Sequence, residues 1–202
     1  MSFDWSDELR IMLRPASTYR QLSKAADESG VWVMIRRPLF VALVVGSFVS
    51  ITVSGHLTIY LLLDGMVFWS FILVLQAILM SGIVVSFGRR RIPTSKALDL
   101  FFMGHGPWLM WLLGIAATCL FFPLKQFYLW PVQWGWVLPI SLVVAWIWSS
   151  VTSFAFLRGA LEISTLRAIA LLVLYTFLLW GIVISLLVVT ETIPLHRITS
   201  LS

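Results

Sequence analysis

Charged residues are scarce in this chain. Only 11% of its 202 residues are Asp, Glu, Lys or Arg, whereas 60% are hydrophobic, and the mean hydropathy is +0.97. An average soluble domain has about 25% charged residues. This deficit excludes an ordinary soluble domain and predicts a protein built largely of membrane-embedded segments.

Residue types that form catalytic and metal centres are equally few. The single cysteine, Cys119, lies inside an apolar segment, which excludes an intrachain disulfide and a thiolate cluster. The histidines His56, His105 and His196 lie near different segment ends, and there is no His-Glu-x-x-His helix or Gly-rich phosphate loop. Ser54 and His56 lie too close together on one helix to act as nucleophile and base on one atom. We therefore predict no catalytic residue, metal ligand or cofactor, and no enzymatic activity.

The N-terminal residues lack the apolar core of a cleavable signal peptide. Residues 1–37 instead carry mixed charge, with apolar residues at helical spacing from Trp5 through Leu9 to Leu13. Pro15 is suited to open a second helix, because proline is tolerated in a first turn. We interpret residues 1–37 as an amphipathic cytoplasmic arm that lies in the membrane interface, binds a partner or folds over its own bundle.

Long apolar runs dominate the rest of the chain. Residues 66–87 contain no charged residue and end at three consecutive arginines. At about 1.5 Å per residue, this helix would be roughly 33 Å long and would cross a hydrocarbon core of about 30 Å. The runs predict five spans, at residues 39–60, 66–87, 108–122, 137–157 and 169–190, with a short interfacial helix at 97–103. We expect an all-α polytopic membrane protein: a five-transmembrane-helix bundle over residues 38–190 and a short extracytoplasmic tail over 191–202.

Basic residues are distributed unequally between the two sides of this topology. Five spans place 12 of the 14 Lys and Arg residues on the side of the N-terminus, and only Lys125 and Arg197 on the other. Because cytoplasmic loops retain Lys and Arg, we expect a cytoplasmic N-terminus and an extracytoplasmic C-terminus. Lipid, not nucleic acid, then accounts for the net charge of +5. The basic residues expected to anchor the topology and to contact anionic headgroups are Arg36, Arg37, Arg89, Arg90 and Arg91.

Small residues recur at every fourth position in two of the spans. Such faces let another helix approach closely, and we expect these two to pair. The small residues of the first span are Ala42, Gly46, Ser50 and Ser54, and those of the fourth span are Ser141, Ala145, Ser149 and Ser153.

Aromatic residues are concentrated between the third and fourth spans. Indole and phenol rings favour the headgroup level, which predicts an interfacial belt on the far face of the membrane. A platform that binds lipid or a protein partner is the alternative. The belt residues are Tyr128, Trp130, Trp134 and Trp136.

The predicted spans contain no Lys, Arg, Asp or Glu, whereas ion and proton paths usually include such residues. Gln76 is the strongly polar residue of the second span, and it either lines a polar route or bonds to a neighbouring helix. We therefore expect an integral membrane scaffold or accessory subunit that acts through lipid contacts and a protein partner or homo-oligomer. The alternative is a small channel or transporter of an ion or apolar solute.

Three stretches carry a resemblance to a known family. They are Leu-Arg-Pro-Ala-Ser-Thr-Tyr-Arg-Gln-Leu at 13–22, Thr-Ser-Lys-Ala-Leu-Asp-Leu at 94–100 leading to Gly106-Pro107, and Leu-Glu-Ile-Ser-Thr-Leu-Arg-Ala at 161–168. In this order, with five spans, they resemble the Yip1 family, particularly its bacterial branch. Eukaryotic members of that family are membrane scaffolds in vesicle traffic that contact small GTPases. The associated Asp-Leu-Tyr-Gly-Pro signature has no match here, so GTPase binding is not transferred to this chain. The resemblance implies a polytopic membrane fold in a bacterial inner membrane.

Overall fold

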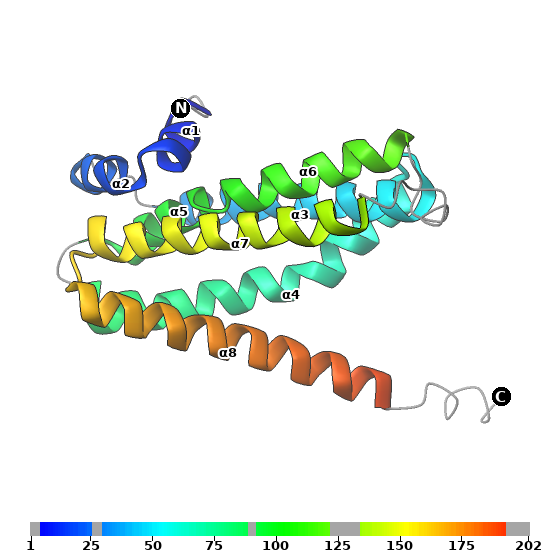
Figure 1. Cartoon of the computed structure of the whole chain (residues 1–202). Coiled ribbons are helices and arrows are strands. Elements are labelled where there is room, and N and C mark those ends of the chain that lie inside the picture. Colours follow the sequence, from blue (N-terminus) through cyan, green and yellow to red (C-terminus); the bar gives the residue numbers. More distant parts are fainter. Residues whose placement is uncertain (1–4, 26–29, 89–91, 122–133, 193–202) are drawn as a thin grey trace.

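The structure is a computed structural model that describes residues 5–25, 30–88, 92–121 and 134–192, and these residues fold as helices and short connections without any strand (Figure 1). The helices, in chain order, are α1 (Trp5–Leu13), α2 (Pro15–Lys24), α3 (Val31–Ser54), α4 (Ile59–Ile83), α5 (Thr94–Met103), α6 (Gly106–Phe121), α7 (Trp134–Gly159) and α8 (Thr165–Thr192). A π-helical turn, Val84–Gly88, extends α4.

Four of these helices, α3, α4, α7 and α8, are long and apolar enough to cross a membrane. The helices α5 and α6 meet at a bend of 41° and provide a fifth crossing if the pair forms one span. The prediction of an all-α protein with membrane-spanning helices is therefore confirmed.

The helix α3 packs most extensively on α4, and glycine makes this approach possible. A Cβ atom on Gly46 would clash with the carbonyl oxygen of Leu62 and with Met66. A Cβ atom on Gly65 would lie 2.9 Å from the Cβ of Val49. The small face of the first span thus contacts α4 instead of the matching face of α7, which corrects the expected pairing.

The remaining long helices form a loose bundle. The helix α6 packs on α3 and α7, whereas α8 contacts α4 and α7 and diverges from α7 toward its C-terminal end (Figure 1). The end of α7 and the beginning of α8 lie at the same end of the molecule as α1 and α2 (Figure 1).

The N-terminal helices fold against the bundle. Proline occupies the first position of α2, as its missing N–H allows. Tyr19 of α2 is fully buried, with its ring edge-on to Phe156 of α7 at 5.6 Å between centroids. The absence of a side chain at Gly159 leaves room for Tyr19, and the indole N–H of Trp148 donates to the carbonyl of Met12 at 3.0 Å. Of the three arrangements considered for the arm, this is the one folded over its own bundle.

Candidate functional site

A cluster of ionic side chains joins the arm to the bundle. Arg36 donates from Nε and Nη2 to the two carboxylate oxygens of Asp99, at 3.1 and 3.0 Å. Arg37 donates from Nε to Asp99 at 2.7 Å and from Nη1 to Glu8 of α1. These four side chains are largely buried and carry equal numbers of opposite charges, so each charge is compensated within the cluster.

Lys96, from the same short helix as Asp99, fixes α2. Its ammonium group donates to the carbonyls of Ser23 and Ala25, at 3.0 and 2.6 Å, at the C-terminal end of α2. A cation is favourable there because the last carbonyls of a helix have no partner within it. The polar residues of α5 therefore hold both α3 and the arm.

The bend between α5 and α6 is the junction of several elements. The carbonyl of Gly104 accepts a hydrogen bond from the hydroxyl of Thr152 in α7 at 3.0 Å. A Cβ atom on Gly104 would lie 2.5 Å from the hydroxyl oxygen of Tyr19, so only glycine permits this contact. The bend places the next residue, His105, inside the bundle, where its Nε2 lies 3.1 Å from the side-chain oxygen of Gln76 in α4.

The Gln76–His105 pair lies between two connected spaces. The larger space, of about 360 Å³, is bounded by α3, α4, α6 and α8 and is apolar, with Trp69, Trp108 and Trp180 among its lining side chains. The smaller space, of about 70 Å³, also reaches α7. Both are lined by the same five residues at their junction: Gln76, His105, Trp108, Leu179 and Trp180.

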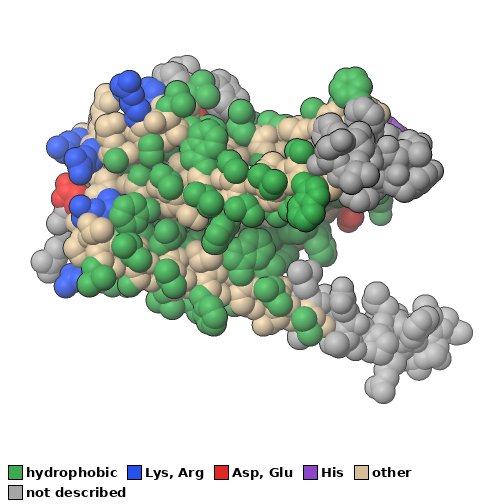
Figure 2. Space-filling model, viewed as in Figure 1, with side chains coloured by type: hydrophobic (Ala, Val, Ile, Leu, Met, Phe, Trp, Pro, Cys, Tyr) green, Lys and Arg blue, Asp and Glu red, His purple; other side chains and the backbone are tan. Residues whose placement is uncertain are grey.

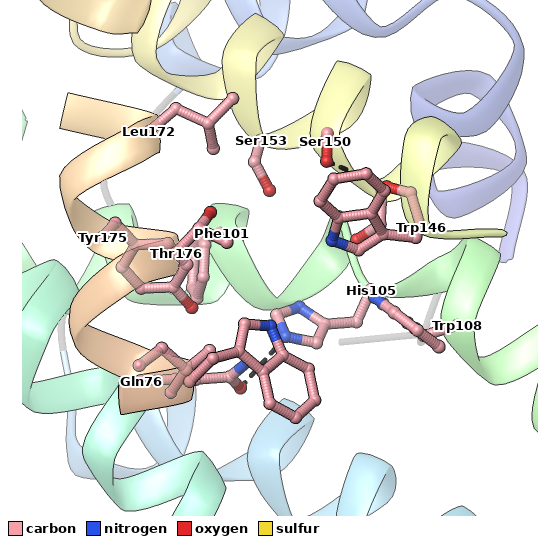
Figure 3. Close-up of a pocket in the computed structure, with 13 residues that line it drawn as sticks. Gln76, Phe101, His105, Trp108, Trp146, Ser150, Ser153, Leu172, Tyr175 and Thr176 are labelled. Atoms are coloured by element: carbon pink, nitrogen blue, oxygen red, sulfur yellow. Dashed lines mark hydrogen bonds between the residues drawn. The ribbon is translucent and has the colours of Figure 1, made fainter. Parts of the chain in front are cut away.

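The smaller space is the polar part of the cavity. Hydroxyl groups of Tyr175 and Thr176 approach it from α8, and those of Ser150 and Ser153 from α7, around the Gln76–His105 hydrogen bond (Figure 3). None of the described residues that line either space carries a formal charge at neutral pH. The arrangement can therefore hydrogen-bond an uncharged polar group while its apolar side chains contact an apolar body.

Two of the residues expected to anchor the protein to lipid headgroups, Arg36 and Arg37, contact carboxylate side chains of the protein itself. The guanidinium groups of Arg36 and Arg37 point into the ionic cluster with Asp99 and Glu8 and leave only 17% and 11% of their side chains exposed. We assign them to the docking of α1 and α5, which differs from the expected headgroup contact. Arg89, Arg90 and Arg91 lie outside the described residues.

The small residues and the aromatic belt are placed in part. Ser50 bonds through its hydroxyl to the backbone of Thr58 in the turn before α4, and Ser141 accepts a hydrogen bond from Trp111 of α6 at 3.0 Å. Ser149 and Ser153 line the polar space. Within the belt, Trp136 is exposed. Tyr128 and Trp130 and the side chain of Trp134 lie outside the described part of the chain.

Sequence reasoning singled out Gln76 but not its partner. His105 lies near the end of a predicted segment, and no pattern in the sequence links it to a residue 29 positions earlier. The every-fourth spacing of the serines in α7 predicts a packing face, and the same spacing also places their hydroxyl groups on one face of the helix. Among the described residues, no group of His, Cys, Asp or Glu could hold a metal ion.

No family model, curated protein or solved structure matches this chain. The resemblance of residues 13–22, 94–107 and 161–168 to the Yip1 family stays a prediction.

Proposed function

We propose that this protein is a five-span integral membrane protein that binds an uncharged amphiphilic or apolar solute within its helical bundle and carries it in the membrane. The observation behind this proposal is the cavity described above. It is apolar over most of its wall and polar only where Gln76 and His105 meet the hydroxyl groups of α7 and α8.

The size and chemistry of the cavity support a small-molecule ligand. Its larger part, at about 360 Å³, falls within the roughly 300–1,000 Å³ of ordinary ligand sites, which are also mostly apolar with a few polar groups. A charged ligand would leave its charge uncompensated beside these residues, which is costly in an apolar environment. An alcohol, ester or amide group with a hydrocarbon body fits the lining best.

The arrangement of the helices supports five crossings. The α5–α6 pair leads from the end where the arm lies to the far end, beside α3 and α7 (Figure 1). Visible Lys and Arg side chains gather at the end with the arm (Figure 2). We therefore propose that this end faces the cytoplasm of a bacterial cell, with the C-terminus on the opposite side of the inner membrane.

A scaffold or accessory subunit is the second candidate. The helix α8 favours it, because large apolar side chains such as Val173, Phe177 and Ile184 are exposed along it. Lipid or a helix of another subunit could cover them. Two other candidate contact surfaces, the small residue Gly46 of α3 and the arm, are already used for contacts within the chain. Purification in mild detergent, followed by identification of any bound protein, tests this candidate.

Substitutions that fill the cavity with a larger side chain test whether it binds the solute. Val183 of α8 lines the large space and is 2% exposed, whereas the next residue, Ile184, is 56% exposed. We expect Val183→Trp to reduce saturable binding of dodecanol to the protein in nanodiscs at least tenfold, and Ile184→Trp to leave it unchanged. Thermal unfolding verifies that both variants fold, and Leu112→Trp, which fills the same space from α6, provides a second variant. Unchanged saturable binding in a folded cavity-filling variant would refute the proposal.

A further inference from the structure

A second pocket lies beneath α1, where the arm meets α3 and the beginning of α6. Its volume is about 130 Å³. Apart from Glu8 and Arg37, its described lining consists of apolar side chains and Gly106. The pocket is therefore a narrow apolar space with one ionic end.

Glu8 offers an unused hydrogen-bond acceptor at that ionic end. One oxygen of its carboxylate, Oε1, accepts from Arg37. The other, Oε2, is buried and has no hydrogen-bond partner among the described residues. A buried carboxylate oxygen without a donor is costly, and a ligand that brings an N–H or O–H group would remove this cost.

The pocket opens at the surface of the protein, where its lining side chains are partly exposed. Leu9 of α1 and Met110 and Leu113 of α6 line the pocket, yet each has about half of its surface exposed. The lining of α6 runs from Gly106 to Leu113, which corresponds to about 10 Å along a helix that packs in the bundle. A chain lying in the pocket would thus run along α6, with its polar end beside the arm.

We infer that this pocket holds part of one acyl chain of a phosphatidylethanolamine molecule, whose ammonium group donates to Oε2 of Glu8. A primary ammonium carries three N–H donors, whereas the quaternary ammonium of phosphatidylcholine carries none. The net negative charge of phosphatidylglycerol is unfavourable beside the carboxylate. Arg14 is exposed on the arm and is available to the lipid phosphate. This site is independent of the proposed solute in the central cavity.

Competition between two lipids tests the assignment. The protein is placed in nanodiscs that contain equal amounts of phosphatidylethanolamine and phosphatidylcholine with identical acyl chains, and the retained lipid is measured by native mass spectrometry. We expect the wild type to retain phosphatidylethanolamine at least tenfold over phosphatidylcholine. Glu8→Gln should reduce that ratio about tenfold, because it removes a charge-assisted hydrogen bond. Asp7→Asn, which changes the neighbouring carboxylate that pairs with Arg10, should retain the wild-type ratio.

A second variant separates lipid binding from docking of the arm. Leu113→Trp fills the pocket but leaves the Glu8–Arg37 pair in place, and we expect it to lose the retained lipid. Leu120→Trp is its control, since Leu120 is similarly exposed on the same helix and does not line this pocket. Equal retention of the two lipids by the wild type, an unchanged ratio in folded Glu8→Gln, or undiminished retention in Leu113→Trp would each overturn the inference. If Glu8→Gln does not fold, the amount of lipid that Leu113→Trp retains tests the inference by itself.

Discussion

Arg36 holds both carboxylate oxygens of Asp99, a residue 63 positions later in the chain. Arg37 donates from Nε to one of those oxygens and from Nη1 to Glu8 of α1. Three segments that are distant in sequence are thereby connected by charges at one end of the bundle. A parallel guanidinium–carboxylate pair has strict geometry, so it fixes the relative position of α3 and α5 as well as stabilising them.

We expect Asp99→Asn to destabilise the protein by about 3 kcal/mol. Removal of the Asp99 charge takes away the carboxylate that Arg36 and Arg37 share and leaves Glu8 to compensate Arg37, which is costly because the cluster is largely buried. Asp64→Asn is the matched control, since Asp64 is exposed near the beginning of α4 and does not belong to the ionic cluster. Its effect on the free energy of unfolding should stay within about 0.5 kcal/mol. Unfolding of the detergent-solubilised protein by a denaturing detergent measures the difference, and equal effects of the two variants would show that the cluster contributes nothing.

The glycine contact between α3 and α4 yields a second prediction. Gly46→Leu should destabilise the protein by at least about 1–3 kcal/mol, because its side chain would overlap the backbone of Leu62. Gly82→Leu, at a position of α4 with open space around it, should have little effect. The same unfolding titration compares the two variants. A tolerated Gly46→Leu would contradict the close packing of these helices.

The sequence predicts the helices much better than the contacts between them. Apolar runs identify every long helix, because helix formation in a membrane depends on the composition of the segment itself. The beginning of α3 is different. It starts at Val31 and includes Pro38, although the Arg36-Arg37-Pro38 sequence indicated a later start at residue 39. The two arginines are accommodated within the helix because Asp99 neutralises them, and no local pattern reveals that pairing.

The same limit applies to the candidate site. Gln76 stands out in the sequence as a polar residue in an apolar run, but its partner depends on the bend at Gly104. That bend depends in turn on Tyr19 and Thr152, which come from the arm and from α7. Contacts among four separate segments define the cavity, so periodicity along one segment cannot predict it.

Tyr19 gives a prediction with a pH dependence. Its hydroxyl is buried without a hydrogen-bond partner among the described residues, so Tyr19→Phe should leave stability at neutral pH nearly unchanged, whereas Tyr19→Ala should cost about 3–5 kcal/mol. Burial raises the pKa of Tyr19 above its ordinary value of 10.0. Above pH 10 the unfolded state therefore loses this proton first, and the wild type should lose up to about 1.4 kcal/mol more stability per pH unit than Tyr19→Phe. Parallel unfolding curves of the two proteins between pH 9 and 11 would contradict this.

Gln76→Leu tests the polar junction of the cavity. The variant leaves Nε2 of His105 without its partner and removes a group that would bond the solute, so we expect about a tenfold loss of dodecanol binding and a stability loss of about 1–3 kcal/mol. Thr118→Val is the control, because the hydroxyl of Thr118 bonds to the carbonyl of Gly114 in its own helix and Thr118 does not line either space. If both variants bind dodecanol like the wild type, Gln76 does not contribute to the site.

Five-span and four-span topologies differ in whether two positions of the chain lie on the same side of the membrane, so labelling these positions decides the number of crossings. Ser17 of α2 and Ser164, just before α8, are both exposed. If α5 and α6 together form one span, the two serines lie on the same side of the membrane, whereas a four-span protein would place them on opposite sides.

Cys119 is the single cysteine of the chain and is buried. The variant Cys119→Ala therefore provides a background in which Ser17→Cys and Ser164→Cys can each be labelled with an impermeant maleimide. We expect both to react only from the cytoplasmic side, because the basic residues of the arm and of the α7–α8 connection favour that side. Reaction of Ser164→Cys from the outside, with Ser17→Cys protected there, would show that the α5–α6 pair does not cross the membrane.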